Sequence, residues 1–233
     1  MQLWPQMGTL GVLGITVEEE YGGAGMGYLE HCVAMEEISR ASASVGLSYG
    51  AHSNLCVNQI RRNGTAEQKR RYLPKLISGE HVGALAMSEP DAGSDVVSMR
   101  LKAEKKGDHY ILNGNKMWIT NGGFADVMIV FAKIDDDEKL TAFIVDGHAE
   151  GITKNPEEKK MGIKGSSTRQ IFFNDVHVPV DNLLYEREQG FKIAVNILNI
   201  GRIKLGGAVL GAGKDACTHS TRYANEREQF GRP

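Results

Sequence analysis

The chain has 233 residues, of which 41% are hydrophobic and 24% charged, and its net charge is -2. This composition is typical of a soluble globular protein of one or two domains. The near-neutral charge argues against nucleic acid as a partner, and no apolar run approaches the roughly 20 residues of a membrane span. Three separated cysteines and seven scattered histidines match no disulfide framework and no metal site, which favours a reducing compartment.

Residues 1–81 are predicted to form a helical domain. The stretch Tyr28–Ala43 places apolar residues on one side at a helical period, and a second helix is expected over Ser44–Arg61. Thr65, with Gln68 three residues later, has the spacing of a capping box and predicts the start of a third helix.

Residues 82–181 are predicted to form a β-domain. Short segments rich in Val, Ile and Phe are separated by turns of Gly, Asp or Asn, and this regular spacing indicates a small antiparallel barrel or sandwich. The segments do not alternate with helices, which argues against a Rossmann domain. The expected strands are Gly83–Met87, Met99–Lys105, Tyr110–Lys116, Val127–Ala132, Leu140–Val145 and Arg169–Asn174.

Residues 182–233 are predicted to contain one long helix, from Phe191 to about Gln229. Five glycines between Gly201 and Gly213 lower its intrinsic helicity, each by up to about 1 kcal/mol. Such a helix needs close packing against other helices. We therefore expect a chain that is truncated at its C-terminal end, and at its start as well.

The segment AMSEPDAGSDV, Ala86–Val96, follows the first expected strand. Its residues Asp91, Gly93, Ser94 and Asp95 would form a tight loop of exposed backbone N–H groups. Such a nest suits an anion or the electron-rich edge of a heteroaromatic ring. Taken alone, a short Gly/Ser/Asp loop of this kind is more often an ordinary turn between two strands.

The segment KMWITNGGFADV, Lys116–Val127, contains a tryptophan and a threonine two positions apart. On a strand, Trp118 and Thr120 would point to the same face. There the indole could pack against a flavin and the hydroxyl could hydrogen-bond the flavin N5 edge. Taken alone, Trp118 is also compatible with a core residue beside a turn.

The segment EPDAGSD followed by NGNKMWITNG, Asn113–Gly122, resembles the joint signature of the acyl-CoA dehydrogenases. The resemblance extends to GITVEEEYGGAG, MEEISRASASVG, QKRRYLPKLISGE and YANEREQFGRP, and these segments together span the chain. Residues 28–133 resemble the isovaleryl-type members most, whereas residues 190–233 are more similar to straight-chain or bacterial members.

The resemblance implies an α+β fold with an N-terminal helical domain, a central antiparallel β-barrel or sandwich domain and a C-terminal helical bundle. This chain would hold a partial first domain, the β-domain and only the first long helix of the bundle. The resemblance also implies FAD as the cofactor and an acyl-CoA thioester as the substrate, which is oxidised to the trans-2-enoyl-CoA. In this reaction a carboxylate removes the α-proton while hydride leaves the β-carbon for flavin N5.

Several residues match the family's binding motifs. Ser94 would contact the CoA part of the substrate, Thr120 would hydrogen-bond near N5, and Arg227 would reach an FAD phosphate across a subunit interface. The FAD-binding positions are Leu85, Ala86, Met87, Ser88, Glu89, Pro90, Asp91, Ala92, Gly93, Ser94, Trp118, Ile119, Thr120 and Arg227. The substrate-binding positions are Ser94, Asn199, Ile200, Gly201 and Arg202.

The catalytic carboxylate of the family has no match in this chain. In isovaleryl-type members it is a Glu just before the arginine of the long helix, and that position here is Gly201, in LNIGR. In most other members it lies farther along, which would place it beyond Pro233. We therefore expect the 233-residue chain alone to be inactive. The complete enzyme would act on a short- or medium-chain or branched acyl-CoA.

Three functions are compatible with the sequence. The first is a dehydrogenase of fatty-acid or branched-chain amino-acid catabolism, which would assemble as a homo-oligomer, a dimer or tetramer, and pass electrons to an electron-transfer flavoprotein. It would lie in the mitochondrial matrix of a eukaryote or the cytoplasm of a bacterium. The second is an acyl-CoA oxidase, and the third is a non-catalytic binding or assembly protein with the same fold.

Overall fold

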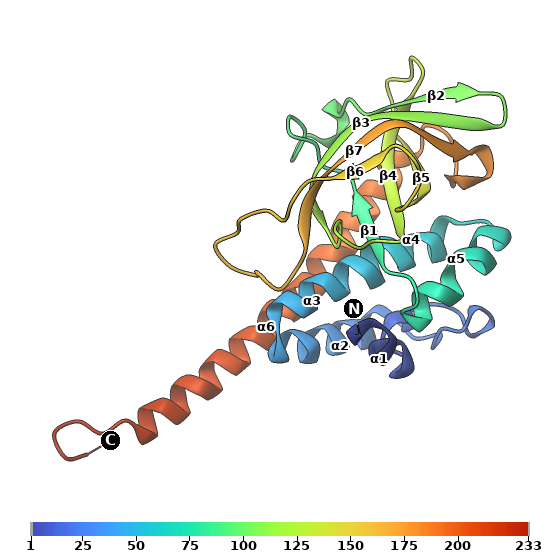
Figure 1. Ribbon diagram of the computed structural model, residues 1–233. Coiled ribbons are helices and arrows are strands. Elements are labelled where there is room, and N and C mark those ends of the chain that lie inside the picture. The colour runs from blue at the N-terminus through green and yellow to red at the C-terminus, as the bar shows by residue number, and fades with distance from the viewer. Residues whose placement is uncertain (1, 233) are drawn as a thin grey trace.

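The structure is a computed structural model that describes residues 2–232. Helices, then strands, then one long helix follow one another along the chain (Figure 1). This order confirms the α+β fold, whereas the domain boundaries at 81/82 and 181/182 stay a prediction. The first helices are α1 (Leu3–Thr9), η1 (Val12–Gly14), η2 (Glu19–Tyr21), α2 (Tyr28–Ala41), α3 (Ala43–Gly50), η3 (Ala51–Val57), α4 (Asn58–Asn63) and α5 (Ala66–Ser78).

Helix α5 begins and ends where its sequence predicts. The Thr65 hydroxyl accepts a hydrogen bond from the Gln68 amide at 3.1 Å, and the Gln68 side chain accepts one from the Thr65 amide at 3.0 Å. This capping box satisfies two N–H groups that the helix leaves free. The helix stops at Gly79, whose φ is 75°. A Cβ there would lie 2.2 Å from the Trp4 carbonyl oxygen, so the glycine lets α1 approach.

The predicted single helix over Ser44–Arg61 is wrong in its middle, because η3 is a π-helix between α3 and α4. The π-helix brings His52 and Asn54, two polar neighbours, into the interior together. His52 is satisfied there: its Nδ1 accepts from the Gly83 amide at 2.9 Å and its Nε2 donates to the Leu76 carbonyl at 3.0 Å. The helical region is therefore tied to the first strand by a buried imidazole.

The β-domain is one eight-stranded sheet of order β6-β7-β3-β2-β4-β5-β8, with β1 paired to β4. Most pairings are antiparallel as predicted, but β1 and β2 both run parallel to β4. The strands are β1 (Gly83–Ala86), β2 (Lys102–Lys106), β3 (His109–Thr120), β4 (Val127–Ile134), β5 (Thr141–Asp146), β6 (Ile152–Lys154), β7 (Thr168–Pro179) and β8 (Leu183–Leu184). Short 3-10 turns, η4 (Val96–Ser98) and η5 (Val180–Asn182), precede β2 and β8.

The strand predictions failed mainly at short elements and at boundaries. β6 and β8 were missed because three and two residues are too few to show an alternating pattern. β2 begins at Lys102 rather than Met99, since η4 ends only at Ser98 and the amides of Arg100 and Leu101 then bond to the Glu89 carboxylate instead of a neighbouring strand. β3 and β7 extend beyond the predicted ends and pair with each other along their length.

Strand β4 joins the two layers of the molecule. Val127, Ile129 and Phe131 pack with the helices in one core cluster, whereas Met128 and Val130 face a second cluster inside the β-domain. Because successive strand residues point to opposite faces, a strand covered on both sides needs an unbroken apolar run. The sequence VMIVFA meets that need.

Helix α6 (Gly190–Glu226) packs along α2 and, less extensively, α3. The first part of the long helix therefore has the close helical packing that its glycines require, from the N-terminal helices rather than from other helices of a bundle. Ile193, Ile197 and Ala208 are buried, and the last buried residue is Gly211, where a Cβ would lie 2.0 Å from the Glu36 carbonyl oxygen. Lys214 still bonds Glu36 of α2, and the last part of the helix extends beyond the other helices (Figure 1).

Helix α6 also qualifies the expectation of no membrane span. It is the only helix among residues 2–232 that is long and apolar enough to cross a membrane. Core helices of soluble proteins meet the same criterion, and the first part of α6 is packed against other helices. The length and apolar composition of α6 are therefore only weak evidence for a membrane span.

Candidate functional site

The two loop motifs lie side by side in the structure. β1 ends at Ala86, and the Ser88 carbonyl just beyond it accepts a hydrogen bond from the Met117 amide at 2.8 Å. Lys116 Nζ donates to the Met87 carbonyl at 3.0 Å and to Glu89 Oε1 at 2.9 Å. The residues that follow β1 are therefore bonded to the end of β3.

The Lys116–Glu89 ion pair is buried, with side-chain exposures of 0% and 8%. Glu89 also accepts hydrogen bonds from the backbone amides of Arg100 and Leu101, at 2.6 and 3.0 Å. Burial lowers the pKa of Lys116 to about 8, and the Glu89 carboxylate opposes that shift. A buried pair with this many hydrogen bonds fixes geometry, and here it fixes the loop between β1 and β2.

The predicted cofactor-binding residues of this loop divide into two groups. Ala86, Met87, Glu89 and Ala92 are buried and hold the loop together. Leu85 is partly buried and packs against the core beside the helices. The remaining positions are half-buried or exposed and are the ones that a ligand could contact: Ser88, Pro90, Asp91, Gly93 and Ser94. The assignment of these residues to FAD stays a prediction.

Trp118, Ile119 and Thr120 lie on a β-bulge near the end of β3. The register shifts between Lys116 and Ile119, and both of these residues are buried, which breaks strict alternation. Trp118 has a φ of 63° and its side chain is 58% exposed, while Thr120 is half-buried. Bulges occur often beside active sites, where they re-aim a side chain. Here the indole ring of Trp118 is exposed at the bulge, and the half-buried Thr120 follows two residues later.

Thr120 also lines a cavity of about 210 Å³ between α3, η3 and α6. Of the predicted substrate-binding residues, Gly201 and Arg202 line it, whereas Asn199 and Ile200 do not, and Asn199 is exposed. Ser94 does not line it either. The remaining lining residues are mostly apolar, with the exceptions of Asn54 and Lys204.

Sequence reasoning missed Asn54 and Lys204, which line this cavity in addition to the predicted polar residues Thr120 and Arg202. Both side chains are buried, at 2% and 1% exposure. Both Asn54 amide atoms and Lys204 Nζ lack a hydrogen-bond partner among residues 2–232. The helical period could have revealed Lys204, because it shares the buried face of α6 with Ile197 and Ala208.

Lys204 is stabilised only in part by its surroundings. Its Nζ lies 4.8 Å from the centroid of the Tyr28 ring, a contact that contributes about 2 kcal/mol when desolvated. The penalty for burying an ammonium group is several kcal/mol, so the ring does not offset it. Accordingly, burial lowers the pKa of Lys204 to about 7. The neighbouring His31 is also buried, and its burial, followed by repulsion from Lys204, lowers its pKa to about 3.

None of the described residues that line this cavity is a carboxylate. At Gly201 there is room for a side chain, because a Cβ would lie 3.5 Å from Asn54 Nδ2 and 3.7 Å from Leu55 Cδ2, both ordinary contacts. The cavity therefore offers a mostly apolar space with a hydroxyl at one side, and none of the described residues in its wall supplies a carboxylate.

Arg227 is far from these groups in the chain. It caps the C-terminal end of α6 and is exposed, 16 positions beyond the last buried residue Gly211, or about 24 Å along the helix axis. The structure does not bring Arg227 to the Trp118 bulge of the same chain. A contact across a subunit interface, as the sequence predicts, stays a prediction.

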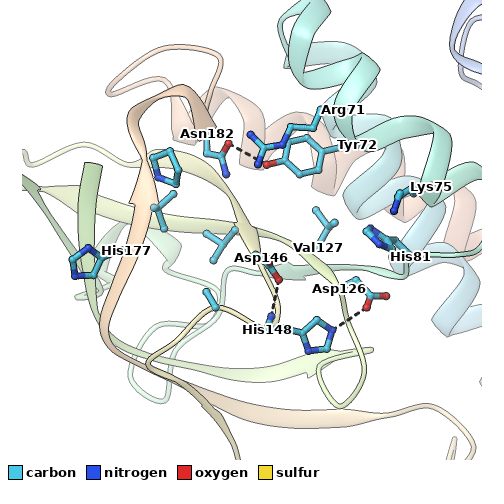
Figure 2. A pocket seen from close by; sticks show the side chains of 14 residues that line it. Arg71, Tyr72, Lys75, His81, Asp126, Val127, Asp146, His148, His177 and Asn182 are labelled. Carbon is cyan, nitrogen blue, oxygen red and sulfur yellow. Dashed lines mark hydrogen bonds and ion pairs between the residues drawn. The ribbon is translucent and has the colours of Figure 1, made fainter. Parts of the chain in front are cut away.

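A second cavity of about 560 Å³ lies between α5 and the edge of the β-domain (Figure 2). Several of its polar side chains are paired: His148 bonds to Asp126 at 2.9 Å, and the Tyr72 hydroxyl donates to Asn182 at 3.0 Å. None of the predicted site residues lines it. The Tyr72–Asn182 bond fastens helix α5 to the β-domain, and we assign the cavity no ligand.

Three family models match successive parts of the chain. They are the N-terminal domain of the acyl-CoA dehydrogenases over residues 1–80, the middle domain over residues 84–176 and the C-terminal domain over residues 188–233.

Known proteins resemble the chain along its whole length. The mitochondrial isovaleryl-CoA dehydrogenases of Pongo abelii and Solanum tuberosum are 55% and 52% identical to it over 99% and 100% of the chain. The chain spans 56% and 57% of the length of those two proteins. A crystal structure of acyl-CoA dehydrogenase complexed with FAD from Bacillus anthracis superposes with a TM-score of 0.96 and 46% identity, over 100% of this chain and 40% of that one.

Proposed function

Because this chain belongs to the acyl-CoA dehydrogenase family, we propose that it carries the flavin-binding part of an enzyme that converts an acyl-CoA to the trans-2-enoyl-CoA. The observation that carries the proposal is the hydrogen-bonded junction of the Ser88 loop with the Trp118–Thr120 bulge. This junction holds an exposed indole, a hydroxyl and an open loop on one rigid frame.

The residues at the junction fit a planar, hydrogen-bonding cofactor such as FAD. Trp118 offers an exposed aromatic face, to which a flat heteroaromatic ring can pack. The Thr120 hydroxyl can donate to a ring nitrogen, and the half-buried Ser88 is held next to Met117 on the same strand by its carbonyl. Bound FAD would supply the hydride acceptor, while the Lys116–Glu89 pair keeps these groups in place.

The acyl chain would occupy the cavity beside Thr120, with Gly201 and Arg202 at its edge. Its volume of about 210 Å³ supports a short- or medium-chain or branched acyl group. Removal of the α-proton needs a carboxylate, and since none lines the cavity, the base would come from residues other than those in its wall. We place it outside residues 1–233, because the position before Arg202 is a glycine.

The partners follow from the same proposal. Electrons would pass to an electron-transfer flavoprotein, and the protein would assemble as a homo-oligomer, a dimer or tetramer, in which Arg227 of one subunit reaches the FAD of another. Mitochondrial relatives support the mitochondrial matrix for a eukaryotic source, and the cytoplasm would apply to a bacterial one.

A second candidate function is favoured by one observation, the absence of a carboxylate among the described cavity-lining residues. A protein with this fold and no base would bind an acyl-CoA without oxidising it. The two candidates differ in whether the flavin becomes reduced.

The deciding experiment uses the full-length protein loaded with FAD. Under anaerobic conditions, a series of acyl-CoAs is added and the flavin absorbance near its visible maximum is followed. Bleaching supports the dehydrogenase, whereas a spectral shift without bleaching supports the non-catalytic binder. A full-length protein that retains no flavin after reconstitution would contradict the proposed cofactor.

The assignment of Thr120 has a matched control. Thr120→Val removes a hydroxyl at the bulge, whereas Thr153→Val makes the same change on the exposed strand β6. We expect the first variant alone to slow flavin reduction, because a net hydrogen bond is worth about 0.5–1.5 kcal/mol. Equal behaviour of the two variants would remove Thr120 from the site.

A further inference from the structure

Asn54 is a buried amide that the fold leaves without a partner. The residue is 2% exposed, and neither its Oδ1 nor its Nδ2 has a hydrogen-bond partner among residues 2–232. Because buried polar groups are normally paired, this exception needs an explanation. Every other buried Asn or Gln side chain of the described residues forms at least one hydrogen bond, namely Asn58, Gln59, Gln68, Asn121 and Asn182.

The free amide lies in the wall of the cavity beside Thr120, on the side of α6. Asn54 lines this cavity from η3, and Gly201 lines it from α6. Asn54 Nδ2 lies 3.5 Å from the position that a Cβ of Gly201 would take, so the amide faces α6 at this glycine. The element that carries Asn54 is a π-helix, and π-turns are frequent at functional sites. A group that enters the cavity beside Gly201 would therefore lie within reach of the amide.

The proposed reaction brings a hydrogen-bond acceptor into this space. Removal of the α-proton needs a carboxylate, and none of the described lining residues supplies one. An apolar acyl chain offers Asn54 no acceptor, whereas a carboxylate accepts several hydrogen bonds. Since neither amide atom has another partner, the amide can turn its N–H groups toward that carboxylate.

We propose that Asn54 is a positioning residue that donates a hydrogen bond to the carboxylate base and holds it beside Gly201 for removal of the α-proton. The inference deepens the proposed function and rests on it, since it assumes that the acyl chain and the base meet in this cavity. A donor to the charged form of a carboxylate lowers its pKa, whereas burial in an apolar cavity raises it. Asn54 would therefore keep the base ionised in surroundings that favour its neutral form.

The other ionisable groups of the cavity wall are both on α6. They are Arg202 and Lys204, and none of the lining residues from α2, α3, η3 or β3 is ionisable. Arginine stays charged, whereas burial lowers the pKa of Lys204 to about 7, so Lys204 itself titrates near neutral pH. The informative quantity is therefore the difference between an Asn54 variant and the wild type, because Lys204 is present in both.

The test follows anaerobic flavin reduction in the full-length, FAD-loaded protein as a function of pH. The substrate is the acyl-CoA that bleaches the wild-type flavin fastest, added at saturation. Asn54→Leu removes the donor and keeps a side chain of similar size. We expect it to raise the apparent pKa of the base by about one to two units, the shift that corresponds to a hydrogen bond with a charged group. Asn174→Leu, at an exposed position of β7, should leave the profile unchanged.

An apparent pKa that Asn54→Leu leaves unchanged would overturn the inference. If the pKa is unchanged but the dissociation constant of the thioester rises, the amide contacts the substrate and not the base. If Asn54→Leu does not retain FAD, Asn54→Ala is measured in its place, and loss of FAD from both variants would show a structural role instead. Should no acyl-CoA bleach the wild-type flavin, the proposed function itself fails, which is distinguishable because the other outcomes all include bleaching of the wild type.

Discussion

Two lysines of this protein are almost completely buried, and they lie in different settings. Lys116, on β3, forms an ion pair with Glu89 and donates to the Met87 carbonyl. Lys204, on α6, faces the Tyr28 ring and has no hydrogen-bond partner among residues 2–232. The first belongs to a closed polar network, which makes the β-domain loop rigid. The second lines a mostly apolar cavity and has no hydrogen-bond acceptor among the described residues.

The two lysines differ in how far the fold satisfies them. The Lys116–Glu89 pair supports the loop that follows β1, and its two members form hydrogen bonds with each other and with the backbone. The Lys204 ammonium and the Asn54 amide have no hydrogen-bond partner among the described residues. The two lysines should therefore contribute differently to the stability of the fold.

The largest expected effect is that of Lys116→Met. The variant leaves the Glu89 carboxylate buried without its cation, and removing one partner of a buried pair costs about 3–5 kcal/mol. Urea unfolding followed by circular dichroism should show that loss. Lys106→Met, at an exposed position of β2, should change the unfolding free energy by no more than about 0.5 kcal/mol. A small effect of Lys116→Met would mean that the pair does not hold the loop.

Lys204→Met should act in the opposite direction. Because it removes a buried cation that has no acidic partner, the unfolding free energy should stay equal or increase, by up to about 1–4 kcal/mol. Because the variant also loses the contact with the Tyr28 ring, we expect an increase in unfolding free energy near the lower end of this range. The same urea experiment applies. A loss of unfolding free energy as large as that of Lys116→Met would show that Lys204 also stabilises the fold, and that the two lysines do not differ in this respect.

A third buried group, His52, stays neutral and makes the fold acid-labile. Burial lowers its pKa from 6.5 to about 4, and its Nδ1 already accepts from the Gly83 amide. Because the unfolded chain binds the proton more readily, stability falls as the pH drops from about 6.5 towards 4, by up to about 1.4 kcal/mol per pH unit. His52→Gln should make the slope of unfolding free energy against pH shallower, leaving the part due to the likewise buried His31, whereas His148→Gln, at an exposed position, should not. An unchanged slope in the first variant would contradict the assignment.

The sequence predicts the paired lysine's surroundings better than those of the unpaired one. The motifs around Ser88 and Trp118 are local strings, and their place at strand ends follows from alternation and turn residues. The β-bulge at Trp118 and the π-helix at Ala51–Val57 were not predicted, because a shifted register and a widened turn depend on tertiary packing. The cavity was missed for the same reason, since Asn54 and Lys204 are distant in sequence and meet only when η3 packs near α6.

The smallest expected effect concerns the glycine beside the open cavity. Gly201→Ala adds a Cβ that would meet Asn54 Nδ2 at 3.5 Å and Leu55 Cδ2 at 3.7 Å, which is ordinary contact. Alanine also favours a helix over glycine by about 1 kcal/mol, so the melting temperature of the variant should stay level or rise by a few degrees. Gly211→Ala is the matched change ten residues along α6, where the Cβ would lie 2.0 Å from the Glu36 carbonyl oxygen. Since a backbone atom cannot move aside as a side chain can, α2 and α6 must separate, and this variant should be clearly destabilised. Equal melting temperatures for the two variants would mean that α6 is not seated on α2 as closely at Gly211 as the structure places it, and that the space at Gly201 is no more open than the rest of the helix interface.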